Sequence, residues 1–430
     1  MKTNYFKFLA TTLCAGALFF ATTGNAQWTA LGPNTTDAPV VSLQSFNGNL
    51  YVGGMFFHPY ADLAVWNGSS YSAPLVSAGN EVYSMASFDS VIYFSIGDFI
   101  YQQVNSSVSK IATLNSQASA IYFWNHKLYA GGNFTQLNGK KYGYIASYDG
   151  TKWDSLMSGG ANGMTSDVYA FCSYNNQLVV GGYFWTGGTT LLDNIGLWDG
   201  AGNWTKLGNG MYDPAGGYSV NALVSYNGIL YAGGDIDSAS GVKISGLAQW
   251  NGTKWDSVGN RHSTSSTVYA LTVFNGGVVA GGYFDSIMSW NGVAWSVLGK
   301  IPSASEVEAL AVYNGNLYAA GQFSMVNGVS TNYVAEYTIP TSVNEISTSN
   351  SISVYPNPNN GTFNLEITNY KSGMTNTVEV YNILGEKVYS QLAIDNSQLT
   401  INLKQPAGIY LYRVLSAEGK TMGTGKVIVK

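Results

Sequence analysis

Apolar residues in this chain occur in short runs that meet at Asn-Gly pairs. In the clearest copy, residues 220–234 place Asn227-Gly228 between two apolar runs, and residues 247–259 place Asn251-Gly252 between two more. Asn-Gly between alternating apolar residues is typical of a two-residue hairpin turn, because both turn positions need a positive φ. This segment therefore predicts two hairpins, which together supply four antiparallel strands.

The same segment recurs along residues 40–338. Small residues, most often Gly-Gly, mark the end of the second strand in each clear copy. These markers are Gly53-Gly54, Gly131-Gly132, Gly181-Gly182, Gly233-Gly234, Gly281-Gly282 and Ala320-Gly321, and a degenerate copy surrounds residues 92–95. Seven copies about 36 to 52 residues apart, each with four short strands, predict a seven-bladed β-propeller.

The two ends of the repeat region complement each other. The seventh copy ends after its third strand at residues 334–337, and residues 28–32 match the fourth strand at residues 204–208 almost residue for residue. We expect the N-terminal segment to complete the last blade, because closing the ring removes an open sheet edge. The expected fold class is all-β, with the propeller at residues 27–340.

The repeated residues are predicted to build this scaffold. Glycine pairs suit a place where backbones approach so closely that a Cβ would clash. An apolar layer is expected from Phe56, Phe134, Phe184, Phe284 and Phe323. Packing between blades is expected from Trp66, Trp198, Trp250 and Trp290 on the third strands and Trp153, Trp204, Trp255 and Trp295 on the fourth.

The first 26 residues resemble a secretory signal. Lys2 and Lys7 precede the apolar run of residues 8–21, and small residues end at a predicted cleavage site between Ala26 and Gln27. The run is too short to span a membrane, and no later stretch qualifies as a transmembrane segment. Cys172 is then the one cysteine of the mature chain, and we expect it to be buried in a strand.

Composition agrees with a large exported β protein. Glycine occurs 51 times, aromatic residues make up 14%, and charged residues make up 10% against roughly 25% in a typical domain. Without the signal, 17 basic and 24 acidic residues give a formal net charge of −7. This charge argues against a nucleic acid partner, because phosphate binding needs clustered Lys and Arg.

A different pattern follows the propeller. Residues 341–350 form a polar linker, and residues 351–430 hold about seven short strands, which is typical of a small β-sandwich. Its motifs are specific in sequence. They are Tyr355-Pro356-Asn357-Pro358 with Gly361, an Asn-x-x-Gly turn at Gly385, a strand with Gly408 and Tyr410, and an end with Lys426, Val427 and Lys430.

This segment resembles the type A C-terminal sorting domain of the type IX secretion system. The resemblance implies a Bacteroidota protein that reaches the periplasm by its signal peptide and is then read by an outer-membrane translocon. It also implies a sortase that removes the domain, after which the cargo is released or attached to surface lipopolysaccharide. Within the domain, residues 426–430 are the predicted recognition segment.

The propeller itself resembles kelch-type repeats of the galactose-oxidase-like kind. The resemblance rests on Tyr-x-Gly-Gly after the second strand and on apolar-x-Trp before Asn/Asp-Gly. Galactose oxidase implies a copper site with two His, two Tyr and a Cys cross-linked to Tyr. Here His58, His126 and His262 fall in three separate copies, and Cys172 has no Tyr partner in that pattern. We therefore predict no metal, no cofactor and no such activity.

Function is expected where the copies differ. Loops between second and third strands, and links between blades, are predicted to open on one face of the propeller. Candidate binding residues in these loops are Trp185, Asp193, Tyr212, Asp213, Asp235, Asp237, Arg261, His262 and Tyr283. Aromatic side chains with carboxylates suit a sugar or a peptide. Asp235 and Asp237 could also supply oxygens to calcium, although a solvated turn explains them as well.

No catalytic residue follows from the sequence. The leading hypothesis is a secreted or surface-attached, non-catalytic propeller that binds an unidentified protein or glycan on its loop face. The rival is a lyase or hydrolase that acts on polysaccharide, and a third interpretation is a passive surface component. An enzyme should bring carboxylates and a His or Tyr together at the axis with perturbed pKa values. A binding module should instead expose an aromatic or polar patch.

Overall fold

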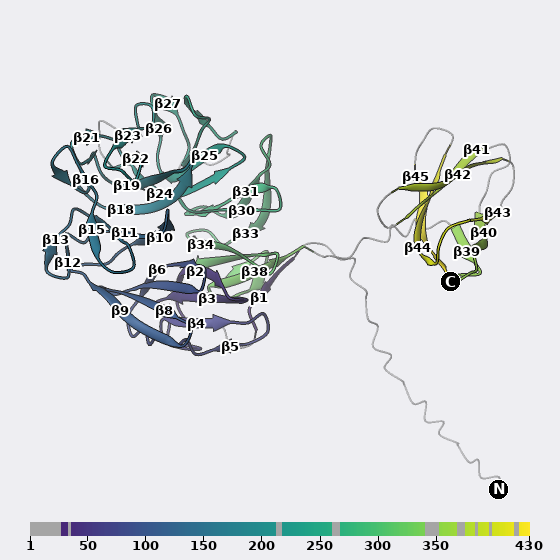
Figure 1. Cartoon of the computed structure of the whole chain (residues 1–430), viewed down its shortest axis with the longest axis horizontal. Helices are drawn as coiled ribbons and strands as arrows, with labels where there is room; N and C mark the ends of the chain where they lie inside the picture. The colour runs from purple at the N-terminus through teal and green to yellow at the C-terminus, as the bar shows by residue number, and fades with distance from the viewer. Residues whose placement is uncertain are drawn as a thin grey trace, which may run out of the picture. The chain divides into compact units, whose positions relative to one another are not determined.

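The computed structural model describes residues 27–32, 36–211, 217–259, 267–339, 352–367, 375–382, 386–394, 398–416 and 421–430. These residues form strands and turns without a helix, so the predicted all-β class is confirmed. Accordingly, none of the described residues belongs to a helix that could cross a membrane. The chain divides into two compact units, one of which is Ala26–Ile339 and the other of which contains Pro340–Lys430 (Figure 1).

The described residues of the first unit contain seven four-stranded antiparallel sheets. Six of them take their strands from consecutive stretches of the chain. The first sheet consists of β2 (Val40–Phe46), β3 (Asn49–Gly54), β4 (Leu63–Trp66) and β5 (Tyr71–Ser72), and the second of β6 (Val82–Phe88), β7 (Val91–Ile96), β8 (Phe99–Val104) and β9 (Ser107–Thr113). The third consists of β10 (Ala120–Trp124), β11 (Lys127–Gly131), β14 (Ile145–Tyr148) and β15 (Trp153–Ser155), and the fourth of β18 (Val168–Tyr174), β19 (Gln177–Gly182), β22 (Ile195–Trp198) and β23 (Trp204–Lys206). The fifth consists of β24 (Ser219–Tyr226), β25 (Ile229–Asp235), β28 (Leu247–Trp250) and β29 (Trp255–Ser257), and the sixth of β30 (Val268–Phe274), β31 (Gly277–Gly282), β32 (Ser286–Trp290) and β33 (Trp295–Lys300).

The remaining sheet joins the two ends of the unit. It is built from β34 (Glu306–Tyr313), β35 (Asn316–Gln322), β38 (Val334–Thr338) and β1 (Gln27–Ala30). Short two-stranded ribbons decorate the connections. These are β12 (Gln136–Leu137) with β13 (Lys140–Lys141), β16 (Met157–Ser158) with β17 (Ala161–Asn162), β20 (Thr186–Gly187) with β21 (Thr190–Leu191), β26 (Ser238–Ala239) with β27 (Val242–Lys243), and β36 (Met325–Val326) with β37 (Val329–Ser330).

The first strands of these sheets surround a common axis. In order around the ring, β2, β6, β10, β18, β24, β30 and β34 each contact the next, and β34 contacts β2. Their labels encircle the middle of the ring in Figure 1. The arrangement is therefore that of a β-propeller, with each sheet as one blade.

The N-terminal strand closes this ring. β1 pairs antiparallel with β38, so that Trp28 lies opposite Tyr337 with 5.0 Å between the ring centroids. The Trp28 indole also donates a hydrogen bond of 2.8 Å to the carbonyl oxygen of Leu298 in the preceding sheet. The predicted pairing between the N-terminal segment and the last copy is present in the structure.

Each Gly-Gly pair lies where backbones crowd. A Cβ on Gly233 would lie 2.5 Å from Cγ1 of Val268 in the next sheet, and one on Gly234 would lie 1.9 Å from the Ser219 carbonyl oxygen in its own sheet. The other copies repeat both approaches. The prediction that these glycines allow close approach is confirmed, because a Cβ on the first glycine would clash with the next blade and one on the second would clash with the backbone of its own blade.

The tryptophans join neighbouring blades as predicted. The Trp255 indole donates to the Leu207 carbonyl at 2.9 Å, and the Trp295 indole donates to the Val258 carbonyl at 2.8 Å. Cys172 is buried in β18. The predicted phenylalanine layer holds except at Phe284, which is only half-buried because its connection to β32 is short.

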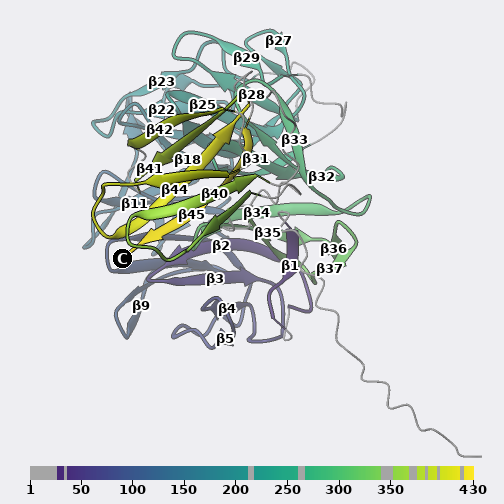
Figure 2. The same cartoon turned by 90° about the vertical axis from the view of Figure 1, so that its right-hand side faces the viewer.

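The second unit contains two sheets in the described residues (Figure 2). One is built from β39 (Ile352–Tyr355), β40 (Thr362–Ile367) and β43 (Gln398–Asn402), and the other from β42 (Lys387–Ile394), β41 (Thr375–Tyr381), β44 (Gly408–Leu415) and β45 (Thr421–Val429). Side chains of both sheets, such as Phe363 and Val380, share one apolar cluster. Two sheets with a shared core agree with the expected small sandwich.

Replacing Trp28 with alanine tests the closure of the ring. We expect Trp28→Ala to destabilise the protein by roughly 3 to 5 kcal/mol, because it removes a buried indole and its hydrogen bond between blades. Deletion of residues 27–32 should lower the melting temperature by several degrees or abolish folding. Thermal unfolding measures both, and Gln27→Ala, at an exposed position on the same strand, is the control. An unchanged melting curve for the deletion would contradict closure.

Candidate functional site

The loops between second and third strands and the links between blades lie at the same end of the sheets. The backbone N–H groups of Met55, Tyr183 and Tyr283, which follow second strands, donate to carbonyl oxygens of Pro39, Asp167 and Thr267, which precede first strands. The loops between second and third strands therefore open on the same side as the links between blades. We call this side the loop face, as the sequence predicted it.

Large apolar side chains are exposed on this face. Phe57 is 77% exposed and Trp185 is 59% exposed, each in a connection between a second and a third strand. Other exposed residues in such connections are Met55, Tyr60, Tyr183, Leu191, Tyr283, Met325 and Val329. Exposed apolar side chains grouped on one face are typical of an interaction surface.

A cavity of about 780 Å³ lies beside Trp185. Its wall combines loops of two neighbouring blades, since β20 and β21 belong to the β18–β23 blade and β26 and β27 to the β24–β29 blade. The lining side chains are Trp185, Leu191, Asp193, Lys206, Asn209, Ser238 and Ser240, and Gly241 completes the wall. This volume lies within the range that small-ligand pockets occupy, about 300 to 1,000 Å³.

Polar contacts hold the Trp185 cavity in shape. Asp193 forms an ion pair with Lys206, and the side chains of the two are only 10% and 24% exposed. The Asn209 backbone N–H donates to the Ser240 hydroxyl at 2.7 Å, which links the two blades. Exposed Trp185 and Leu191 can contact an apolar surface of a ligand, while the serine hydroxyls and the Asn209 amide can bind its polar groups.

The structure brings together only part of the predicted site. Trp185 and Asp193 line the same cavity, and the Asp193 carboxylate is already paired with the Lys206 ammonium group. Asp235 and Asp237 are exposed around the end of β25, and Tyr283 is exposed between β31 and β32. The remaining candidates Tyr212, Asp213, Arg261 and His262 lie outside the described residues.

The histidines do not form a metal centre in the described structure. His58 bonds through Nδ1 to Asp37 at 2.8 Å, and His126 lies against the Phe88 ring on another blade. Among the residues that the structure describes, no three His, Cys, Asp or Glu residues are placed to hold a metal ion. Neither the copper site of galactose oxidase nor the kelch subtype is therefore assigned.

Another cavity, of about 230 Å³, lies on the propeller axis. All seven first strands, or the residues just before them, contribute to its wall. The residues at the matching position of successive blades are Val41, Tyr83, Ser119, Tyr169, Asn221, Tyr269 and Glu308. The residue type at this position varies from blade to blade, and it follows a small or branched apolar residue in every blade.

A β-bulge sets this axial position in six of the seven four-stranded sheets that the described residues of this unit form. In the pairing of the first strand with the second, the register skips one residue between Val82 and Ser84, between Val268 and Ala270, and between Val307 and Ala309. The skipped residue has no partner in the ladder. The same shift occurs in the blades that begin with β2, β18 and β24. A bulge re-aims a side chain relative to the sheet, and here the unpaired residue lines the axis.

Glu308 has an unusual environment on the axis. Burial, together with the nearby carboxylates of Glu306 and Glu81, raises the pKa of Glu308 to about 7. Burial and neighbouring carboxylates also raise the pKa values of Tyr83 and Tyr169 to about 12, so both phenols stay protonated at neutral pH. The Tyr169 hydroxyl donates to Asp167 at 3.1 Å.

The sequence analysis missed these axial residues. The signal was present, since a varying residue follows valine at the start of six first strands. A β-bulge leaves no trace in an apolar-polar pattern, so the pattern alone predicts ordinary alternation there. Lys206 was also missed, since it lies on a fourth strand with scaffold residues.

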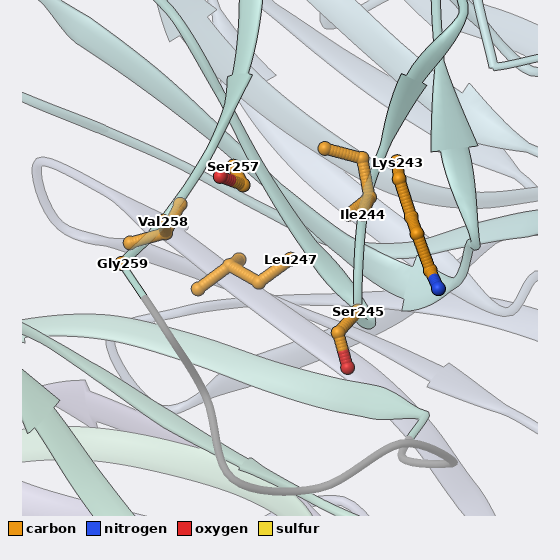
Figure 3. A pocket seen from close by; sticks show the side chains of 7 residues that line it. All are labelled: Lys243, Ile244, Ser245, Leu247, Ser257, Val258 and Gly259. Atoms are coloured by element: carbon orange, nitrogen blue, oxygen red, sulfur yellow. The ribbon is translucent and has the colours of Figure 1, made fainter.

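A third cavity, of about 210 Å³, lies within the β24–β29 blade. Figure 3 shows Ile244, Leu247 and Val258 as its apolar part, with Lys243 and Ser245 beside them. None of the predicted binding residues lines it, and it contains no carboxylate. It therefore adds no candidate chemistry.

The motifs of the C-terminal unit contact one another. The Asn357 amide donates to the Lys426 carbonyl at 3.0 Å and accepts from the Ile428 backbone N–H at 2.9 Å. The backbone of Asn359 bonds with Ile428 and Lys430, and its side chain accepts from the Gly361 N–H. The opening motif is thus fixed to the last strand. Gly385 lies outside the described residues.

The remaining motif residues have structural contacts. The Tyr410 hydroxyl donates to the Pro406 carbonyl at 2.7 Å, Gly408 begins β44 opposite Val429, and Val427 is buried in the core. Tyr355, Pro356 and Pro358 are exposed. On β41, Glu379 binds both Arg413 and Lys387, and bonds from Tyr381 and these cations lower its pKa to about 2.

Comparison with known families decides what this unit is. Residues 353–430 match the family described as secretion system C-terminal sorting domain. This segment is the C-terminal sorting domain of the type IX secretion system. The protein is therefore exported to the cell surface or secreted, and its sorting domain interacts with the secretion machinery.

Comparison with solved structures finds β-propeller-like chains at low similarity. PorZ, a surface component of the type IX secretion system of Porphyromonas gingivalis, is 14% identical at a TM-score of 0.49, with 92% of this chain and 60% of that chain covered. YCF48 bound to D1 peptide is 12% identical at a TM-score of 0.48, with 72% of this chain and 96% of that chain covered. These scores are too low to support an inference about function. No curated protein sequence matches the chain.

The axial carboxyl predicts a pH-dependent stability. Folding raises the pKa of Glu308 from its ordinary 4.5 to about 7. The contribution of Glu308 to the free energy of unfolding is therefore complete below pH 4.5 and is lost as the pH rises through 7. We expect the free energy of unfolding of Glu308→Gln to exceed that of the parent by roughly 1 to 2 kcal/mol at pH 8, after allowance for solvent screening, and by little at pH 5.

Denaturant unfolding at the two pH values measures this difference. Burial also raises the pKa of Glu81, one of the two carboxylates near Glu308, so the titration of Glu81 contributes to the parent curve. The control is Asp89→Asn, an exposed position in the turn after β6, which should keep the parent's pH dependence. An equal effect of Glu308→Gln at both pH values would contradict the assignment.

Proposed function

We propose that this protein is an exported seven-bladed β-propeller that binds a protein or glycan on its loop face without catalysing a reaction. The main support is the exposure of large apolar side chains on the loops of that face, together with the Trp185 cavity. Seven four-stranded sheets in the described residues support the blade count. The propeller displays the ligand-binding loops, and the sorting domain delivers them outside the cell.

A polysaccharide-acting enzyme is the second candidate. The axial carboxyl of Glu308, with its raised pKa and the tyrosines that line the same cavity, is the observation that favours it. Against it, Glu308 is the one carboxylate among the described residues that line this cavity, and glycoside hydrolysis usually needs two. The axial volume of about 230 Å³ is also small for a sugar chain.

The later steps of export are part of the same proposal. A sortase would remove the sorting domain, residues 351–430, after the translocon has read it, and the propeller would then be released or attached to surface lipopolysaccharide. The exposed Lys426 and Lys430, at the edge where the opening motif meets β45, support this edge as the recognition segment. A passive surface component would use the same route but would bind no ligand.

Binding on the loop face is tested with the mature full chain on a glycan array and in pull-downs from cell-surface extracts. We expect a reproducible ligand that is lost or at least tenfold weakened in Trp185→Ala, because the exposed indole is the largest contact surface of the cavity. Val293→Ala is the matched control, since Val293 is 84% exposed in the turn between β32 and β33. Equal loss in both variants would contradict a loop-face site.

The sorting role is tested by Asn357→Ala. We expect poorer export, with the protein retained inside the cell envelope, because the change removes both side-chain hydrogen bonds between Asn357 and β45. Cell fractionation in the native bacterium measures retention, and Asn402→Ala at an exposed position is the control. Deletion of residues 351–430 should abolish export, and secretion of the deleted protein would contradict the assignment.

A further inference from the structure

The axial cavity combines a carboxylate with aromatic rings. Glu308 is its one charged lining residue within the described structure, and the phenol rings of Tyr83, Tyr169 and Tyr269 line the same space. A cation gains from a carboxylate by direct attraction and from aromatic rings by their quadrupole. The lining chemistry is therefore that of a site for a positively charged organic group.

The surroundings of the cavity strengthen its attraction for a cation. Glu306 and Glu81 lie close enough to perturb Glu308, and Asp235 and Glu306 do the same to Tyr269. Among the described residues, none of these four carboxylates takes part in an ion pair. Uncompensated negative charge at a partly enclosed mouth concentrates cations there.

The cavity also limits the size of the ligand. Its volume of about 230 Å³ suits one amino-acid side chain or a small amine rather than a larger ligand. Metal binding is a poorer fit, because no three potential metal ligands gather in the described residues. The three tyrosines and Glu308 come from four different blades, so the ring closure itself assembles the site.

We propose that the axial cavity binds a single ammonium or guanidinium group, presented by a lysine or arginine side chain of a protein or by a free small amine. The group enters from the loop face, and its charge lies near the Glu308 carboxylate. This site is separate from the Trp185 cavity and does not depend on the ligand proposed for that cavity.

The test titrates residues 27–430, the chain without its predicted signal, with four probes at pH 8, and calorimetry measures their binding. These are n-butylammonium, n-butanol, a blocked Gly-Gly-Lys-Gly-Gly peptide and the same peptide with norleucine in place of lysine. We expect at least one cationic probe to bind roughly tenfold more tightly than its neutral counterpart, in keeping with one strong charge contact. Binding of the amine alone identifies a free amine as the ligand class, and binding of the peptide identifies a protein side chain.

Variants locate the binding. Glu308→Gln should reduce the affinity for the cationic probe at least tenfold, and Val293→Ala, at an exposed position in the turn between β32 and β33, should leave it unchanged. Tyr269→Phe should keep most of the affinity because the ring remains, whereas Tyr269→Leu should lose severalfold, which gives a second test if Glu308→Gln folds poorly. No preference for cations, equal affinity in Glu308→Gln, or equal effects of the two Tyr269 variants would overturn the proposal.

Discussion

Close backbone approach at the end of each second strand is the constraint on which the propeller depends. At this point one chain segment meets both the next blade and the first strand of its own blade. A Cβ on Gly233 would lie 2.5 Å from Val268, and one on Gly234 would lie 1.9 Å from the Ser219 carbonyl. In the five sheets with a Gly-Gly pair no side chain fits, and the equivalent position in the other two holds a small residue, Ala320 or Ser95, so small residues here set the spacing between blades.

The same crowding explains where the copies are free to differ. In five blades the valine before the axial position packs against a glycine of the preceding blade, whereas the bulged residue after it is released from the ladder toward the axis. Loops beyond the glycine pairs are also unconstrained by the blades. The axis and the loop face are thus two places where the chemistry differs between copies, and they lie at the same end of the sheets. A rigid ring with two variable zones suits binding.

Sequence patterns predicted the features that depend on local or repeated signals. The hairpins follow from Asn-Gly turns, and the pairing of β1 with β38 follows from the likeness between Trp28 and Trp204. The candidate site was harder to predict, because its contacts join residues with no shared pattern. Lys206 reaches Asp193 from another strand, and Asn357 reaches β45 from far along the chain. Such contacts depend on tertiary folding rather than on periodicity.

Glu308 is the axial residue that the scaffold explains least. The matching position in other blades holds valine, serine or asparagine as Val41, Ser119 and Asn221, so the fold does not require a carboxylate there. Burial and two neighbouring carboxylates oppose its ionisation, which makes the charged form a cost to the folded state. A residue that the fold does not need and that destabilises it when ionised is best explained by a ligand that compensates its charge.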